Sequence, residues 1–431
     1  MKIEDFFRSK YCDDNILISE SEPNSTTNNY NNWFRPFFDY NRFIDRQQYE
    51  FVIVRDDGDV NLNNPPGPEH HFHSQLWQKF LNINNNEIPD FVLVGTEHRG
   101  EEFGEIYVVI DNELRHRFNS GQSGTRRLLV GDIDKNGSDD LVIIGTGIDQ
   151  APYSGGKTQV IYFTPDSYSI SLLDNEAAYF HAGSIGDVNN DGNLDILIIN
   201  NQGPGDTFVY LGNGDKTFEK KSIGDWKFFS NRFNSKLYDV NSDGNLDLVA
   251  GGHEWIQGQI AVDWGQAYRT EVYLGDGEGN FNIKNPIVIP EIDYWGLVND
   301  FIFKDLDQDG LPEIIINRAK GHENYNIVEN DRGYDGIKIQ IVKLVNGEYI
   351  NHQVLDQPDG WFDLPPTWIE WIPFIEFFDV NGDCILDIVP DYEGISNPRF
   401  DQLNRYFGLY YKGNESGYFE LAFFNPSNPY D

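Results

Sequence analysis

The sequence predicts an all-β protein built from repeated four-stranded antiparallel sheets, and three features support this prediction. A short acidic segment recurs along the 431-residue chain. A β-branched apolar run follows each copy, and runs of that length and composition are typical of buried strands. Between the copies, Asn-Gly and Asp-Gly turns join alternating apolar residues, as in Phe208–Phe218 and Val272–Phe281. Such turns are strong signals of β-hairpins.

The acidic segment is nine residues long, and five copies align without gaps. They span residues 132–140, 187–195, 239–247, 305–313 and 379–387. Each carries oxygen-bearing side chains at positions 1, 3, 5 and 9, and four of the five have Gly at position 6. A degenerate sixth copy spans 82–90, and a weaker seventh lies around 9–15. Regular recurrence of this kind indicates one structural unit per copy.

Each unit is expected to hold four strands, with the acidic loop between the first and second and a tight turn between the third and fourth. The segment Val52–Val60 supplies the hairpin of the first unit. Because radial repetition of four-stranded sheets leaves few exposed strand edges, the sequence predicts a single seven-bladed β-propeller. The expected blades cover 1–70, 71–121, 122–175, 176–226, 227–290, 291–360 and 361–431.

The acidic repeats resemble the VCBS/FG-GAP repeat family, the calcium-loop propellers that include the integrin α head. A Gly precedes the loop at Gly131 and Gly186, whereas Tyr238, Lys304 and Phe378 stand there in three other copies. The sequence is therefore nearer the VCBS type than the integrin variant. The resemblance implies a propeller fold, bound calcium and a role in adhesion, carbohydrate binding or scaffolding. It does not specify a ligand.

The acidic loops themselves predict calcium binding. Calcium takes six to eight oxygen ligands, and a nine-residue loop with oxygens at positions 1, 3, 5 and 9 can surround such an ion. Gly at position 6 suits a backbone that turns through positive φ. We expect about five structural Ca²⁺ ions; the alternative is a set of solvated acidic turns. The predicted ligands are Asp132, Asp134, Asn136, Asp140, Asp187, Asn189, Asp191, Asp195, Asp239, Asn241, Asp243, Asp247, Asp305, Asp307, Asp309, Glu313, Asp379, Asn381, Asp383 and Asp387.

The two degenerate loops are weaker candidates for calcium binding. Asn82, Asn84, Asn86 and Asp90 offer one charged group, so a sixth ion would bind weakly there. The matching positions of the first unit, Phe7, Ser9, Tyr11 and Asn15, cannot form a site. Cys12 and Cys384 hold position 6 of the first and last loops and could form a disulfide if these blades meet, although two free thiols are favoured.

The net charge restricts the partners. With 32 Lys+Arg against 70 Asp+Glu, the formal charge of −38 excludes nucleic acid and disfavours anionic membranes. No apolar run reaches the ~18 residues of a membrane span. Calcium loops of modest affinity suit an extracellular or surface location. The segment Met1–Asp5 lacks the basic start of a secretory signal, so a cytoplasmic location stays open.

Histidine, arginine and tryptophan gather at the end of the units opposite the acidic loops, where seven of the nine histidines are expected. Aromatic rings stack on sugars, and charged side chains orient a small ligand. The ligand-binding candidates are His98, His181, Arg126, Arg232, Trp255 and Trp264. The alternative is that these loops are simply polar and that the tryptophans pack between blades.

Three hypotheses for function follow. The leading one is a calcium-stabilised recognition module for a glycan or protein partner. The second is a carbohydrate-active enzyme of lyase or dehydratase type, for which two Gly-His-Glu segments supply weak catalytic candidates, namely His253, Glu254, His322 and Glu323. No nucleophile elbow, HExxH motif or phosphate loop supports catalysis. The third is a structural subunit that docks through the insertions 253–268 and 319–335.

Overall fold

A computed structural model gives the fold of a large part of the chain. It describes residues 52–55, 58–61, 74–86, 90–97, 105–111, 113–119, 121, 125–147, 155–175, 177–200, 206–225, 229, 232–252, 269–292, 295–321, 334–356, 374–378, 383, 385–391 and 409–423. The named elements in these ranges are all β-strands. No helix within them is long and apolar enough to cross a bilayer.

The strands form one hairpin and six four-stranded sheets. The hairpin is β1 (Val52–Arg55) and β2 (Gly58–Asn61). The first three sheets are β3 (Ser74–Leu81), β4 (Asp90–Glu97), β5 (Glu105–Ile110) and β6 (Glu113–Asn119); β7 (Thr125–Gly131), β8 (Asp140–Gly145), β9 (Gln159–Thr164) and β10 (Ser167–Leu172); and β11 (Phe180–Gly186), β12 (Asp195–Asn200), β13 (Asp206–Gly212) and β14 (Phe218–Asp225).

The other three sheets follow the same order. They are β15 (Asn234–Tyr238), β16 (Asp247–Gly251), β17 (Glu271–Tyr273) and β18 (Ile287–Val288); β19 (Leu297–Lys304), β20 (Glu313–Gly321), β21 (Tyr334–Val345) and β22 (Glu348–Asp356); and β23 (Phe374–Phe378), β24 (Asp387–Asp391), β25 (Leu409–Gly413) and β26 (Phe419–Phe423). The all-β class, the four-stranded antiparallel units and the predicted hairpins at Val52–Val60 and Phe208–Phe218 are confirmed.

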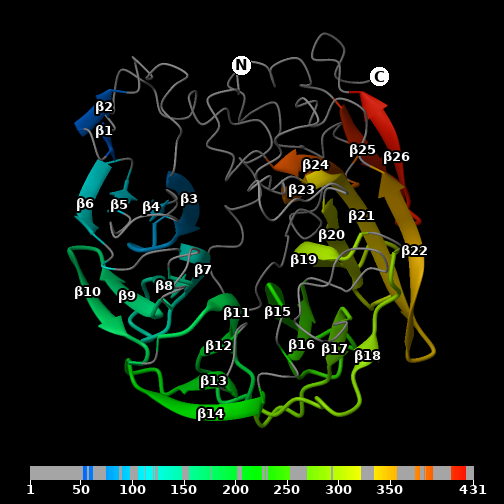
Figure 1. Cartoon of the computed structure of the whole chain (residues 1–431), viewed down its shortest axis with the longest axis horizontal. Coiled ribbons are helices and arrows are strands. Elements are labelled where there is room, and N and C mark those ends of the chain that lie inside the picture. The colour runs from blue at the N-terminus through cyan, green and yellow to red at the C-terminus, as the bar shows by residue number, and fades with distance from the viewer. Residues whose placement is uncertain are drawn as a thin grey trace, which may run out of the picture.

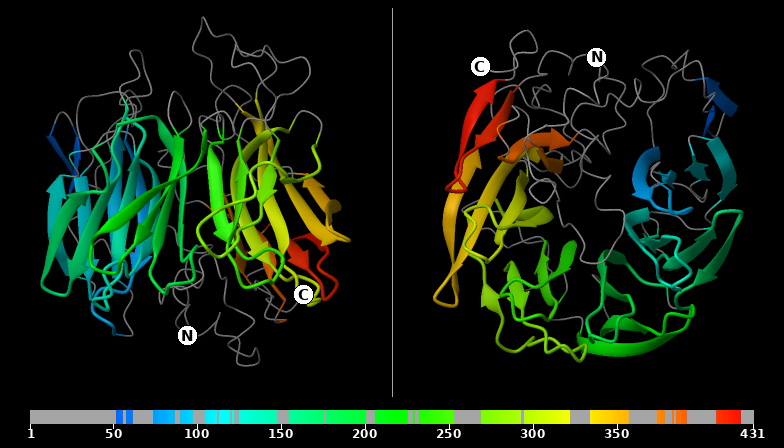
Figure 2. Two further views of the ribbon diagram at one scale, coloured as in Figure 1. Left: turned by 90° about the horizontal axis from the view of Figure 1, so that it is seen from below. Right: turned by 180° about the vertical axis from the view of Figure 1, so that it is seen from behind.

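Within each sheet the strands pair antiparallel with their neighbours in sequence, without a crossover. Figure 1 shows the sheets following one another in chain order about a common centre, with the first strand of each sheet innermost and the fourth outermost. In the side view of Figure 2 the strands of all sheets run in similar directions. The acidic loops, each between a first and a second strand, therefore gather at one end of the assembly. A closed ring of seven blades stays a prediction.

The apolar runs after the acidic loops are buried, and in the four inner sheets of the row they are covered on both faces because each of these sheets lies between two others. In β8, Leu141 and Ile143 belong to a core shared with β3–β6, while Val142 and Ile144 belong to a core shared with β11–β14. Successive strand residues point to opposite faces, so one unbroken apolar run serves both cores. The same sharing joins each later pair of consecutive sheets.

Candidate metal centres

The backbone of the acidic loops repeats closely. Position 6 is a glycine with φ between 82° and 91° at Gly137, Gly192, Gly244 and Gly310, as the sequence predicted. Position 4 is also left-handed, which the sequence did not indicate, because its residues differ from loop to loop. Its φ values are 56° to 59° at Lys135, Asn190, Ser242 and Gln308. Two left-handed residues per loop curl the backbone inward around the oxygen-bearing side chains.

The aspartate at position 1 holds this curl. Asp132 accepts hydrogen bonds from the N–H groups of Asn136 and Gly137, both at 3.0 Å. Asp187, Asp239 and Asp305 make the same pair of bonds in their own loops, at 2.7–3.1 Å. The side chain at position 5 caps the next turn: Asp243 Oδ1 accepts from Asn245 N at 2.8 Å. These carboxylates are thus positioned by backbone donors before any cation is considered.

The carboxylate at position 9 joins the loop to the third strand. Asp247 accepts from Val240 N within its loop at 3.1 Å and from Gly275 N at 2.8 Å. Asp90, Asp140 and Asp195 make equivalent pairs of bonds. Gly275 is required because a Cβ there would lie 2.1 Å from the Leu246 carbonyl oxygen. Position 9 is therefore both a candidate ligand and the pin that holds the loop on its sheet.

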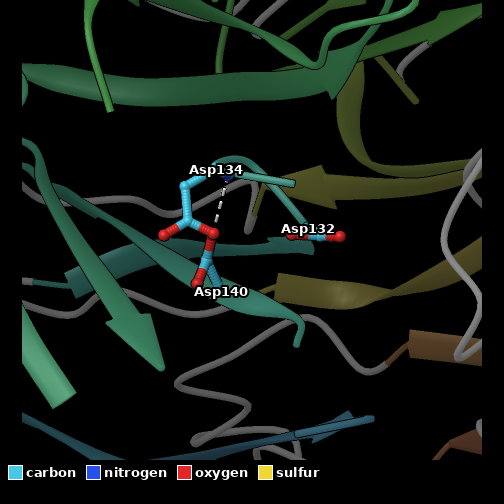
Figure 3. A group of neighbouring side chains, drawn as sticks. All are labelled: Asp132, Asp134 and Asp140. Carbon is cyan, nitrogen blue, oxygen red and sulfur yellow. Dashed lines mark hydrogen bonds between the residues drawn. The ribbon is translucent and has the colours of Figure 1, made fainter. Parts of the chain in front are cut away.

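Loop 132–140 brings its carboxylates together. Oxygens of Asp132, Asp134 and Asp140 lie within 4.8 Å of one another (Figure 3). Burial raises the pKa of Asp140 from 3.8 to about 8 and also raises that of Asp132. A nearby cation favours the ionised form of such groups and offsets the cost of burying them. Clustered hard oxygens fit calcium, and Asp132, Asp134, Asn136 and Asp140 are the residues that would hold it.

Loops 187–195 and 239–247 also have three carboxylates each, at positions 1, 5 and 9, with Asn189 or Asn241 at position 3. Among the described residues, three carboxylates lie within 4.8 Å of one another only in loops 132–140 and 305–313. Burial raises the pKa of Asp195 to about 6 and that of Asp247 to about 7. Within the described ranges, no lysine or arginine forms an ion pair with a carboxylate of either loop. The carboxylates of loops 187–195 and 239–247 therefore have no lysine or arginine of the described residues in direct contact.

Loop 305–313 differs. Asp305, Asp307 and Glu313 place oxygens within 4.8 Å of one another, and burial raises the pKa of Glu313 to about 7. The Lys343 ammonium, from β21, forms ion pairs with Asp307 and with Asp309 at 2.7 Å. In loop 379–387 only part of the predicted site lies in the described ranges. There Lys412 Nζ lies 3.3 Å from Asp383 Oδ2, and Asp387 accepts from Gly413 N at 2.9 Å.

Loop 82–90, the weak sixth candidate, turns its amides toward a neighbouring carboxylate. Asn84 Nδ2 donates to Asp111 at 3.0 Å and Asn86 Nδ2 donates to it at 2.5 Å. Asp111 stands in the turn after β5 and also donates its own N–H to Asp90. The NH2 groups of Asn84 and Asn86 thus supply hydrogen-bond donors to Asp111. The sequence reading missed Asp111, which lies 27 residues from Asn84.

Adjacent loops contact one another through position 4 and its neighbours. Asn190 Nδ2 donates to Asn245 Oδ1 at 2.9 Å, and Ser242 Oγ donates to the Gly310 carbonyl at 3.1 Å. Asn82 and Asp139 exchange two hydrogen bonds across the first interface, at 2.8 and 2.9 Å. At Asn190 and Ser242 the side chain at position 4 therefore reaches the loop of the next sheet.

At the opposite end of the sheets, three innermost strands carry a register shift at corresponding places. The shifts lie at Arg126 in β7, His181 in β11 and Asn299 in β19. β-Bulges of this kind redirect side chains and are frequent beside functional sites. The Asn299 carbonyl accepts from Arg127 Nη2 at 3.2 Å and also from Asn234 Nδ2. Arg126 and His181, two of the predicted ligand-binding residues, thus share a structural irregularity.

The remaining ligand-face candidates fall in two groups. Arg232 is 1% exposed, and its Nη2 lies 2.5 Å from Glu271 Oε2, so its guanidinium braces the interior of a sheet. His181 packs edge-on against Phe233, with ring centroids 4.6 Å apart. The others lie outside the described residues, and so do Cys12 and Cys384; these candidates are His98, His253, Glu254, Trp255, Trp264, His322 and Glu323.

Comparison with protein-family models finds one family that matches part of the chain. The FG-GAP-like repeat family matches residues 187–250 and 239–316. These ranges include the three acidic loops from 187 to 313, so the chain contains FG-GAP-like repeats. A search of curated proteins finds no match.

A search of solved structures finds similarity to the crystal structure of the V. cholerae biofilm matrix protein Bap1, with 16% sequence identity and a TM-score of 0.37. That alignment covers 66% of this chain and 39% of the other.

Proposed function

We propose that this protein is a calcium-stabilised β-propeller of seven blades that serves as a binding module for a glycan or protein partner. The repeated loop geometry carries the proposal. In each of four loops a buried carboxylate at position 9 accepts a hydrogen bond from a backbone N–H of its own loop, while the aspartate at position 1 and the Asp or Asn at position 5 accept hydrogen bonds from further backbone donors; these position-9 residues are Asp140, Asp195, Asp247 and Glu313. Five such loops with a total of 16 carboxylates need counter-charge.

The shared cores support the propeller. Every described four-stranded sheet packs at least one face against the sheet before or after it in the chain. The first and last sheets of such a row each have a second face that needs a covering neighbour. Closing the row into a ring supplies both neighbours at once. In such a ring the hairpin β1–β2 belongs to a further blade, between the first and last of the six sheets.

The bulged inner strands support a binding role for the end opposite the calcium loops. Arg126, His181 and Asn299 come from three separate sheets and stand at matching places on strands nearest the centre. A site assembled from several blades can be varied without altering the repeats that stabilise the fold. Polar and aromatic groups at such a site suit a hydroxylated or weakly cationic partner of this acidic protein.

Thermal unfolding with and without calcium tests the metal. Ligand that binds only the native state adds about 2.7 kcal/mol per site at one hundred times Kd, so saturating calcium should raise Tm well above its value in EGTA. An equal Tm in both conditions would contradict structural calcium. Magnesium at the same concentration is the control, because it demands stricter octahedral geometry.

A glycan array in calcium buffer, read beside a screen of secreted protein fractions, tests the partner. His181→Ala should weaken any interaction found at that end, whereas Arg115→Ala on the outer strand β6 is the matched control. Equal binding by both variants would remove the central end of the sheets from the proposal.

A further inference from the structure

Lys343 occupies a position of the third strand that recurs in the four-stranded sheets, beside the acidic loop. It follows Val342, which pairs with Ile314, the first apolar residue after its loop. By the same register, this position is Leu211 in β13, Leu274 directly after β17 and Lys412 in β25. Two sheets thus carry a lysine where two others carry an apolar side chain, and Lys412 lies 3.3 Å from Asp383 of its own loop.

The ammonium of Lys343 reaches three of the four ligand positions of loop 305–313. It pairs with Asp307 and lies 2.7 Å from Asp309 Oδ2 and 3.8 Å from Glu313 Oε1. The lysine side chain is 19% exposed, and Glu313 is 1% exposed. An ammonium has three donors and can serve several carboxylates at once. Lys343 thus lies among the oxygens on which a metal ion would depend.

The lysine at loop 132–140 makes a different contact. Lys216 belongs to the turn between β13 and β14 of the next sheet, and it reaches only Asp134, at 3.1 Å. Its side chain is 46% exposed and also lies over the Tyr162 ring, 4.6 Å from the centroid. Lys216 therefore stands at the rim of its loop, whereas Lys343 stands within the carboxylate cluster.

We propose that the Lys343 ammonium takes the place of a divalent cation in loop 305–313, so this loop holds its fold without calcium. A calcium ion bound to the same oxygens at roughly 2.3–2.6 Å would lie against the ammonium and be repelled by it. The inference deepens the proposed function and rests on it in one respect: loops that lack a lysine at this position, such as 187–195 and 239–247, take calcium.

The test counts bound calcium ions per chain by equilibrium dialysis of the full-length protein. Lys343→Leu restores the residue found in the two other sheets, and this variant should bind one ion more than the wild type. Lys220→Leu is the matched control, because Lys220 pairs with Asp174 at 2.6 Å, away from the acidic loops. It should leave the count unchanged. An unchanged count in Lys343→Leu would overturn the proposal.

A second measurement does not depend on how well Lys343→Leu folds. Asp305→Asn in the wild-type background should leave the calcium count unchanged, since the loop holds no ion there; a loss of one ion would overturn the inference. In the reverse direction, Leu274→Lys should remove one ion from loop 239–247, and retention of that ion would count against it.

The outcomes also separate this inference from the proposed function. If the wild type binds calcium and Lys343→Leu binds no more, the inference fails while the calcium-stabilised fold stands. If the wild type binds no calcium at all, the proposed function fails, and the gain or absence of an ion in Lys343→Leu still decides the role of the lysine.

Discussion

Loops 239–247 and 305–313 have nearly the same backbone and different chemistry inside it. Both have left-handed residues at positions 4 and 6, and in both the position-1 aspartate accepts two backbone N–H groups. The equivalent position of the third strand is Leu274 beside one loop and Lys343 beside the other, and Lys343 forms ion pairs with its loop. The difference teaches that the loop shape is encoded within the nine residues, whereas the counter-charge comes from another strand.

The largest effect is expected from the position-9 pin. Asp247→Ala leaves the N–H groups of Val240 and Gly275 without their acceptor and should destabilise the fold by about 2–4 kcal/mol. Urea denaturation of the metal-free protein measures this. Asp166→Ala, at an exposed turn between β9 and β10, should change little. Similar losses from both variants would mean that the pin has no special role.

The close contact at Gly275 gives the next effect. Gly275→Ala would place a Cβ 2.1 Å from the Leu246 carbonyl and so force the loop away from the third strand. Overpacking of this kind costs about 1–3 kcal/mol, and the calcium affinity of loop 239–247 should fall with it. Calorimetric titration beside urea denaturation measures both. Calcium binding that survives a clear loss of stability would separate the pin from the metal site.

A smaller effect is expected from the pH dependence of stability with and without calcium. Burial raises the pKa of Asp140 to about 8 and that of Asp247 to about 7, so these groups bind protons more tightly in the native state than when unfolded. Without metal, their contribution to stability falls as pH rises from their ordinary pKa of 3.8 through these values. Calcium favours the ionised form, so the gap between Tm in calcium and Tm in EGTA should widen from pH 6 to pH 8. A constant gap would contradict this.

The contact between neighbouring loops should have the smallest effect. Ser242→Ala removes the hydrogen bond to the Gly310 carbonyl and should cost about 0.5–1 kcal/mol. Ser169→Ala, on an exposed strand position of β10, is the control. If Ser242→Ala also alters calcium binding at loop 239–247, the contact between loops transmits more than stability. Calorimetry of both variants distinguishes these results.

Much of the fold was predictable because its signals are local. The strand after each acidic loop, the hairpin at Phe208–Phe218 and the positive φ of Gly192 all follow from a few adjacent residues. The environment of the loops was not predictable in this way. Lys343 contacts Asp307 from 36 residues away, and Arg127 reaches Asn299 from 172 residues away. Such contacts depend on the pairing of distant strands and on the assembly of separate sheets.

The division of each sheet between two cores has a consequence for folding and for evolution. Because Leu141 and Val142 support different interfaces, a defect in β8 weakens the sheets on both sides of it. An inner sheet of the row cannot then unfold alone without exposing apolar surface on two neighbours, and loss of structure should spread along the row as one cooperative event. For the same reason, ancestral changes of length are expected to have added or removed whole repeats, since a partial repeat would leave one interface uncovered.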